Sequence, residues 1–550
     1  MPLPPTRAPL LWLVLPFAGG IALASDLAPP ADGGRGLLGC AAAAAAAAAW
    51  VGRHESPAAR CGWALLLAAG AAAAGFVHAH RQAPQLAGWD DRPPRELDVT
   101  LRIDRLFASD PRGRMQYGLG QILAAPELAP ELAGLRVYFS TVRRADRTPP
   151  LRNGVYRVRG VVSPLPATGG RADGFEDYLR NLGVAARFQR GQVLAVVRPP
   201  GWLDRLAQRA RGHFAGHLRL GLERRPELAS LQVAMLLGEK ASLSPEQEAA
   251  FLRSGTFHIF SVSGLHVAAI ASAIQAVLLL LRTPRLLRVA VGLLVLWFYV
   301  LVVGANPPAV RAFIMVAFLL ARGLCGLPGN PFAALCAAAL TTLLLDPRQL
   351  FGSGFQLSYL VVGALVLMGA PLAENWLAAW RPWADLPETS WNRWQMAWRW
   401  CGRKALGALA VTVVAVVGST PASIAAFGLF TPGALLANLV VVPLASLALV
   451  AGFISILGGL LGLPGVSIFF NHAAAVTIIV MDRLAAWSTL LPLAHFPAEY
   501  RAPWLAAPSA ALPLVLMLVG AACRWRPAAG GYWLPVAGVV LILLACVRLG

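Results

Sequence analysis

Two histidines and several hydroxyl residues share one short segment, Ser254-Gly-Thr-Phe-His-Ile-Phe-Ser-Val-Ser-Gly-Leu-His-Val267, at the beginning of a long apolar run. Its candidate functional side chains are His258, Ser261, Ser263 and His266. Polar groups at such a position are costly in a membrane unless they pair or line water. The segment therefore indicates either hydrogen bonding between helices or a polar path. Gly255 and Gly264 would allow close backbone approach or a break in the helix.

The segment also raises the alternative of an intramembrane serine protease, because Ser263-Gly264 is similar to the rhomboid sequence GxSG. However, the position two residues before the serine is Ser261 and not glycine. His266 follows on the same predicted helix, whereas the base of such a protease comes from a second helix. A triad is identified by geometry, so we keep the protease as a minor alternative and assign no catalytic residue.

A second segment, Gly304-Ala-Asn-Pro-Pro-Ala-Val-Arg311, joins two apolar runs. Asn306 suits a helix cap, and Pro307 suits the first turn of the helix that follows. Arg311 then lies near a helix N-terminus, where a cation opposes the helix dipole and needs a partner. Its side chain could anchor the helix at the membrane interface or line a pore.

Two further segments place single polar residues in apolar surroundings. Gln356 and Ser358 begin one apolar helix, and Asn438 lies within another. Pro443, five residues after Asn438, is able to kink that second helix. Packing between helices is the alternative to a functional role for each of these residues.

The composition indicates that these segments lie in a membrane protein. Hydrophobic residues make up 57% of the 550 residues and charged residues 13%, whereas soluble proteins contain roughly 25% charged residues. We predict a mainly α fold, a polytopic helical membrane protein with a small β-rich, OB-fold-like extracytoplasmic domain inserted after three N-terminal spans. The predicted domains are N-terminal transmembrane helices (1–80), the β-rich domain (81–200), an amphipathic linker helix (201–228), a transmembrane channel core (229–500) and C-terminal transmembrane helices (501–550).

Charges in the short loops predict the orientation. The first three apolar stretches cover about 8–24, 36–51 and 61–78, and arginines precede the first and separate the second from the third. Because cytoplasmic loops carry the excess of Arg and Lys, we expect a cytoplasmic N-terminus. Residues 81–228 are then periplasmic or extracellular. In the core we expect two spans within 432–463, and a cytoplasmic stretch at 374–404 before a span at 405–427.

Residues 81–200 alternate apolar and polar positions, as in Leu97–Ile103, Leu135–Phe139 and Val155–Val162, which predicts strands of a small barrel. The aromatic residues expected to stack on bases there are Tyr138, Phe139 and Tyr156. Seven of the 17 tryptophans lie between positions 376 and 400, interleaved with arginines. They could also stack on bases, but we favour a position at the membrane interface.

The four segments together, in this order, resemble blocks of the ComEC family of competence proteins. Residues 254–267 are similar to the family motif SGTxHxxxVSGLHV, and Pro307–Ala312, Phe355–Tyr359 and Gly433–Pro443 resemble three later blocks. Gly174–Val184 resembles the family sequence that ends the outer domain. The resemblance covers about 80–480.

The resemblance implies transport of single-stranded DNA across the cytoplasmic membrane during natural transformation, by a channel that is not an enzyme. Many members add a metallo-β-lactamase-like domain. This sequence contains no HxHxDH motif before Gly550, so a nuclease must come from another chain or the sequence is truncated. Without a GxxxxGK[ST] motif, we expect an outer DNA receptor, a cytoplasmic ATPase and a separate nuclease as partners, and we leave a homo-oligomer open.

We expect no cofactor and no metal, because the cysteines and histidines do not show zinc-ligand spacing. The alternative from another class is a transporter or channel for a small anion or a lipid precursor. The arginine-rich outer region favours a polymer over such a small solute.

Overall fold

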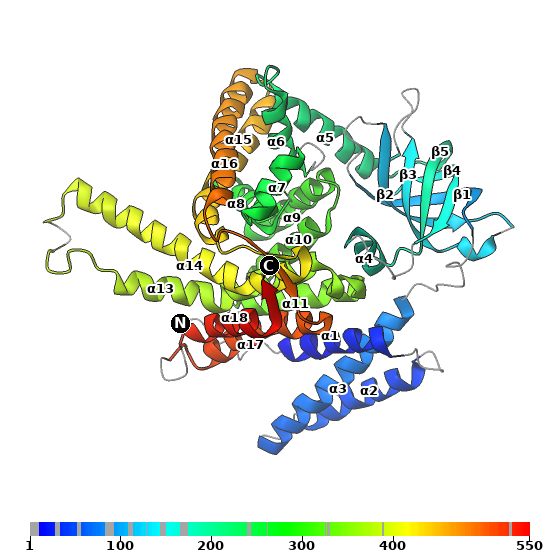
Figure 1. Ribbon diagram of the computed structural model, residues 1–550, viewed down its shortest axis with the longest axis horizontal. Helices are drawn as coiled ribbons and strands as arrows, with labels where there is room; N and C mark the ends of the chain where they lie inside the picture. The colour runs from blue at the N-terminus through cyan, green and yellow to red at the C-terminus, as the bar shows by residue number, and fades with distance from the viewer. Residues whose placement is uncertain are drawn as a thin grey trace.

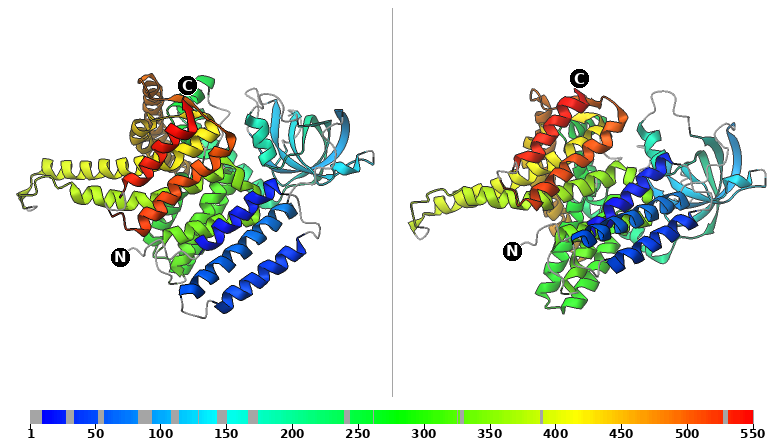
Figure 2. Two further views of the ribbon diagram at one scale, coloured as in Figure 1. Left: turned by 60° about the horizontal axis from the view of Figure 1, so that its bottom comes forward. Right: turned by 90° about the horizontal axis from the view of Figure 1, so that it is seen from below.

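The computed structural model combines a β-barrel with a large body of helices (Figure 1). It describes residues 10–27, 34–51, 57–82, 93–107, 114–127, 129–142, 150–165, 174–238, 244–260, 262–324, 326, 330–387, 390–526 and 531–549. The barrel lies at one end of the long axis, and a helical hairpin projects at the other end (Figures 1 and 2).

Three helices precede the barrel, as predicted: α1 (Leu11–Asp26), α2 (Arg35–Val51) and α3 (Pro57–Gln82). The segment 62–82 of α3 is long and apolar enough to cross a membrane, whereas α1 and α2 are shorter apolar helices. Phe17 and Ile21 of α1 are buried in one cluster with Phe332 and Leu335 of the core. Apolar packing therefore fastens the first helix to the main helical body.

The barrel closes in the strand order β1-β2-β3-β5-β4. Its elements are β1 (Arg95–Leu106), β2 (Met115–Ala124), β3 (Arg136–Val142), β4 (Val155–Pro164), α4 (Gly174–Asn181) and β5 (Ala186–Arg198). β3 and β5 are parallel, and β1 closes the barrel by pairing antiparallel with β4. Leu101, Ile122 and Phe188 fill the interior. The predicted small barrel of the OB type is confirmed, since this is a five-stranded Greek-key arrangement.

Two details of the barrel differ from the sequence prediction. Phe139 and Tyr156 are 0% and 4% exposed and belong to the interior, so they are not available to stack on bases. Side chains alternate across a strand, and Tyr138 accordingly stays partly exposed on the outside. The segment Gly174–Val184 does not end the barrel, because it forms α4 and is followed by β5.

The helical body begins with α5, the predicted amphipathic linker helix. Its helices are α5 (Trp202–Arg219), α6 (Pro226–Leu237), α7 (Pro245–Arg253), α8 (Gly264–Leu280), α9 (Arg285–Val302), α10 (Pro307–Leu324), α11 (Pro331–Leu345), α12 (Ser353–Ala364), α13 (Ala370–Ala379), α14 (Arg393–Phe427), α15 (Ala434–Leu460), α16 (Pro464–Leu490), α17 (Ala506–Ala522) and α18 (Trp533–Cys546). Three short strands follow, β6 (Leu429–Phe430), β7 (Phe496–Tyr500) and β8 (Val547–Leu549). β7 pairs antiparallel with both β6 and β8.

Eight segments in the described part of the chain, one of them in α3, are long and apolar enough to cross a membrane. At 1.5 Å per residue, a helix of about 20 residues spans the ~30 Å hydrocarbon layer. The protein is therefore a multi-pass membrane protein with a mainly helical fold, as predicted.

The prediction of two spans within 432–463 is wrong, because α15 is one continuous helix of 27 residues with Pro443 inside it. A proline in a membrane helix is tolerated where the freed backbone groups find other partners.

The next difference concerns α14, which begins at Arg393 and not near 405. Asn392 and Gln395 form a reciprocal capping box that starts this helix within the predicted cytoplasmic stretch.

The early start of α14 makes it 35 residues long, which exceeds what a bilayer requires. With α13 it forms the hairpin that projects from the body (Figures 1 and 2). The Trp380 ring lies directly against Gly402, where an added Cβ would overlap it. Trp394 and Trp398 on this hairpin are 84% and 63% exposed.

Candidate functional site

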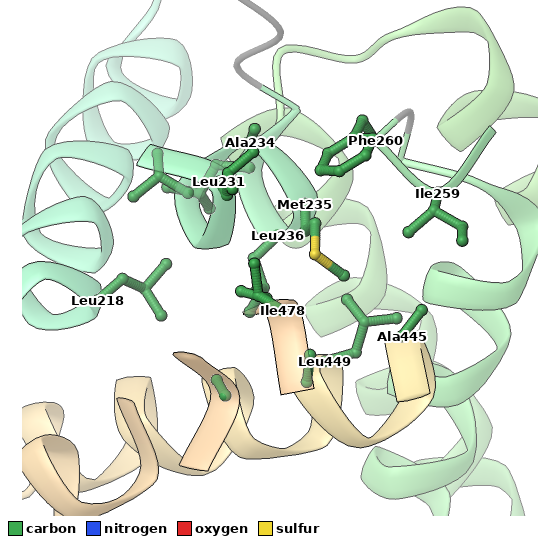
Figure 3. Close-up of a cluster of buried hydrophobic side chains, with 14 of the residues drawn as sticks. Leu218, Leu231, Ala234, Met235, Leu236, Ile259, Phe260, Ala445, Leu449 and Ile478 are labelled. Carbon is green, nitrogen blue, oxygen red and sulfur yellow. The ribbon is translucent and has the colours of Figure 1, made fainter. Parts of the chain in front are cut away.

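The segment that begins at Ser254 is fixed against α15. Gly255 has φ +72°, and a Cβ at this position would lie 2.7 Å from the Cβ of Ala434, so the position requires glycine. The short helical turn η4 (Phe257–Phe260) then places Ile259 and Phe260 in a buried cluster with residues of α6, α15 and α16 (Figure 3). Ala434 lies one turn before Asn438, so the first and fourth segments are neighbours.

Two hydroxyls of the first segment satisfy one another. The Oγ of Ser254 lies 2.7 Å from the Oγ1 of Thr256, and Ser254 also donates to the carbonyl of Phe251. Both side chains are buried, which fits a packing role. His258, in contrast, is exposed.

Ser263 and His266 form a pair at the first turn of α8. The backbone N–H of Ser263 donates to His266 Nδ1 at 3.2 Å, and Ser263 Oγ lies 2.7 Å from the same nitrogen. Because Nδ1 accepts, the ring proton belongs on Nε2. This Nε2 is buried and has no hydrogen-bond partner. The ring therefore caps the helix through one nitrogen and keeps a buried donor on the other.

This geometry counts against the serine protease. In a triad, the serine pairs with one imidazole nitrogen while a carboxylate orients the ring through the other. Here the serine and a backbone N–H share Nδ1, and no acceptor binds Nε2 among the described residues. Across that same part of the chain, no group of three or more His, Cys, Asp and Glu side chains could hold a metal ion.

The second segment lies beside the first. Val262 and Val267, on either side of the Ser263–His266 pair, are buried in one cluster with Ala309 and Ala312 of α10. These two alanines flank Arg311 in the sequence. A Cβ on Gly264 would lie 4.0 Å from the Cβ of Ala312, which is ordinary contact. Gly264 thus begins α8 without the crowding that Gly255 shows.

Arg311 joins the second segment to the third. Its side chain is 3% exposed. The Nη2 atom donates to the carbonyl of Gly354 at 2.8 Å and to Ser358 Oγ at 3.1 Å, and Nη1 donates to Gln349 Oε1 at 3.4 Å. These acceptors are all neutral, and the Nε atom has no partner. The third segment thus supplies hydrogen bonds to the cation but no counter-charge.

Asn306 connects the core to the barrel. Its backbone carbonyl accepts from the amide of Val310, as expected at the start of a helix that Pro307 opens. Its side-chain Oδ1 accepts from Arg105 Nη2 at 3.4 Å, and its Nδ2 donates to the carbonyl of Val303. Arg105 belongs to β1, 201 positions earlier.

The position of Arg105 depends on an irregularity in β1. Pairing with β2 shifts register between Ile103 and Arg105, and such a bulge redirects the side chain that follows. Arg105 therefore reaches out to Asn306 and, at 3.3 Å, to the hydroxyl of Tyr178 on α4. Its guanidinium also lies 5.0 Å from the Phe107 ring centre. Arg105 was not among the site residues predicted from the sequence.

An aromatic row centred on Tyr138 lies beside Arg105. It consists of Phe107, Tyr117, Tyr138, Phe175 and Tyr178, which are joined by ring contacts. Tyr117 and Tyr138 are nearly parallel at 6.3 Å, and Phe175 is 44% exposed. Sequence analysis identified only Tyr138, although tyrosines on the polar face of β2 and in α4 were a visible signal.

The contacts that dock the barrel on the helices include the Arg105–Asn306 bond, the bonds from Asn153 to Asp204 of α5, and those of Arg348. Arg348, between α11 and α12, donates to the carbonyls of Leu182 and Gln82. Burial lowers the pKa of Arg348, and burial likewise lowers the pKa of Arg152 beside Arg105. The junction is therefore rich in partly desolvated arginines.

Not every predicted site residue joins this arrangement. Ser261 lies outside the described residues. Gln356 turns back and donates to the carbonyl of Leu350. The Oδ1 atom of Asn438 is buried without a hydrogen-bond partner, and Pro443 lies inside α15. The structure thus joins Arg311 to Ser358 by a hydrogen bond and packs the valines beside His266 against the helix that carries Arg311.

Comparisons with known proteins identify the family of the chain. A protein-family model described as "Competence protein" matches residues 235–526. The chain is 30% identical over 142 residues to ComE operon protein 3 of Bacillus subtilis (strain 168), covering 26% of this chain and 18% of that protein. It is 34% identical over 147 residues to competence protein ComA of Neisseria gonorrhoeae, covering 25% and 21%.

An uncharacterized protein of Aquifex aeolicus (strain VF5) is 32% identical over 146 residues, covering 26% of this chain and 33% of that protein. The chain thus matches a third or less of the length of each of these relatives. No solved structure matches it significantly.

Proposed function

The chain belongs to the competence protein family, and from this premise we propose that it carries single-stranded DNA across the cytoplasmic membrane during natural transformation. The family match implies a role in DNA uptake. The finer statement, that one strand passes through this chain's helical core, is our proposal. So is the assignment of the barrel to the outer face of the membrane.

The observation that carries the proposal is the convergence of the predicted segments beneath the barrel. The Ser263–His266 pair packs beside α10 through the valines around it. Arg311 of α10 binds Ser358, and Asn306 binds Arg105 of the barrel. A strand with one charge per phosphate requires polar groups and cations along its path through a membrane. These residues supply such groups where barrel and core meet.

The barrel supports a polymer over the alternative substrate, a small anion or a lipid precursor. A lone arginine in the core would suit any anion. The aromatic row beside Arg105 adds ring faces on which successive bases can stack. A small inorganic anion has no aromatic face that could stack on these rings. In this proposal the chain acts as a channel and not as an enzyme, and an outer DNA receptor, a cytoplasmic ATPase and a separate nuclease act with it.

The test is uptake of labelled DNA by a naturally transformable strain that carries this gene. We expect Arg311→Ala and His266→Ala to reduce transfer of label into the cytoplasm, because each removes a polar group from the junction. Arg159→Gln is the matched control, since Arg159 is an exposed barrel arginine bound to Asp98.

Membrane abundance of each variant is measured by immunoblot, so that a loss of protein is not counted as a loss of transport. Transfer at the wild-type rate in both core variants, with the protein present, would contradict the assignment of these residues to the path.

A further inference from the structure

The barrel and the core each contribute one arginine to the junction described above, and neither guanidinium has a carboxylate partner among the described residues. Asp104, next to Arg105 in the chain, pairs with Arg102 and Arg136. No ion pair joins this carboxylate to Arg105 in the described part of the chain. Arg105 instead binds the neutral groups of Tyr178 and Asn306.

Arg311 is the more deeply buried of the two. Its acceptors are a carbonyl, a hydroxyl and a side-chain amide. A buried cation without a counter-charge is costly even when it is hydrogen-bonded. Arg105 binds Asn306, which lies five positions before Arg311 at the start of α10. An anion that contacts both guanidinium groups would stabilise this arrangement most.

Both arginines keep a buried donor free for such an anion. Arg105 Nε and Arg311 Nε are buried and have no hydrogen-bond partner. A guanidinium offers donors only, in a planar fork that matches the oxygens of a phosphate. The chemistry of this donor set therefore selects an anion with several acceptor oxygens and excludes a cation.

We infer that Arg105, which binds Asn306, and Arg311, on the helix that follows Asn306, form a binding site for a phosphodiester group that passes from the barrel into the core. This inference rests on the proposed function and names where the strand's backbone is held. The aromatic row ends at Arg105 through Phe107 and Tyr178, so bases stacked on the barrel would bring their phosphates to this point. Asn306 acts as a positioning residue, since it fixes Arg105 and begins α10.

The experiment measures binding of a short fluorescent oligothymidine to the full chain in phosphatidylcholine nanodiscs across a salt series. Each phosphate contact contributes about 0.7 to the slope of log K against log salt for a single strand. We expect Arg105→Gln to flatten the slope by about 0.7, and Arg311→Gln to do the same. Arg159→Gln, the exposed control, should leave the slope unchanged.

Two further arms identify the anion. With a methylphosphonate oligonucleotide, whose backbone is uncharged, Arg105→Gln and wild type should bind equally. Adding phosphatidylglycerol to the discs separates DNA phosphate from lipid phosphate. An effect of Arg105→Gln that occurs only in the phosphatidylglycerol discs would assign the site to a lipid headgroup and overturn the inference.

The outcomes also separate the site from the function. If wild type binds DNA and Arg105→Gln shows the wild-type slope, the site is wrong while DNA transport stands. If wild type shows no salt-dependent binding at all, the proposed function itself fails. Arg105 is only partly buried, so Arg105→Gln decides the matter even if Arg311→Gln does not fold.

Discussion

Gly255→Ala tests how the first segment is fixed against α15. Alanine at φ +72° is disfavoured by about 1–2 kcal/mol. The new methyl group would also lie 2.7 Å from the Ala434 Cβ, and overpacking of this kind typically costs about 1–3 kcal/mol. We therefore expect a destabilisation of about 2–5 kcal/mol. This corresponds to a factor of roughly 30 or more in the docking equilibrium of the segment.

Gly264→Ala is the matched control in the same segment. Its Cβ would reach Ala312 only at 4.0 Å, and the position begins α8. Alanine favours a helix by up to about 1 kcal/mol over glycine, so this change should be neutral or stabilising. The assay is the temperature at which half of the purified protein is lost from its size-exclusion peak. Equal temperatures for the two variants would refute the packing of Gly255 against α15.

Two further predictions concern the barrel and the hairpin. Tyr138→Ala should weaken oligonucleotide binding roughly 5- to 150-fold, because one stacked base is worth about 1–3 kcal/mol. Phe139→Ala should instead destabilise the fold by about 3–5 kcal/mol. Affinity is measured by fluorescence anisotropy, and a wild-type affinity of Tyr138→Ala would show that the aromatic row does not bind the strand. Gly402→Val should displace Trp380 and increase protease cleavage in the hairpin, as judged by fragment size. Gly407→Ala, in open space on the same helix, should cleave like wild type, and protection of both would show that Trp380 does not close the hairpin.

The helices and the barrel could be predicted because their signals are local. Long apolar runs require helices in a membrane, and period-two alternation marked β1, β3 and β4. The same alternation did not show which face of β3 lies inside, so Phe139 was assigned to the surface. Pro443 in a long apolar run suggested two helices where α15 is one.

The junction could be predicted only in part. Asn306, Arg311 and Ser358 were visible as polar residues at the ends of apolar runs. Arg105 was not, because its direction depends on a register shift in β1, and its partner Asn306 lies 201 positions away. Contacts between the barrel and the core have no local periodicity, so the sequence alone does not indicate them.

The most direct test of the central claim is strand-resolved uptake after deletion of the gene. DNA labelled in one strand and protected from external nuclease is followed separately outside and inside the cytoplasmic membrane. We predict that the deletion strain accumulates protected DNA outside that membrane, with no labelled strand in the cytoplasm, and that the wild-type gene restores transfer. Entry of the strand into the cytoplasm at the wild-type rate in the deletion strain would contradict the account.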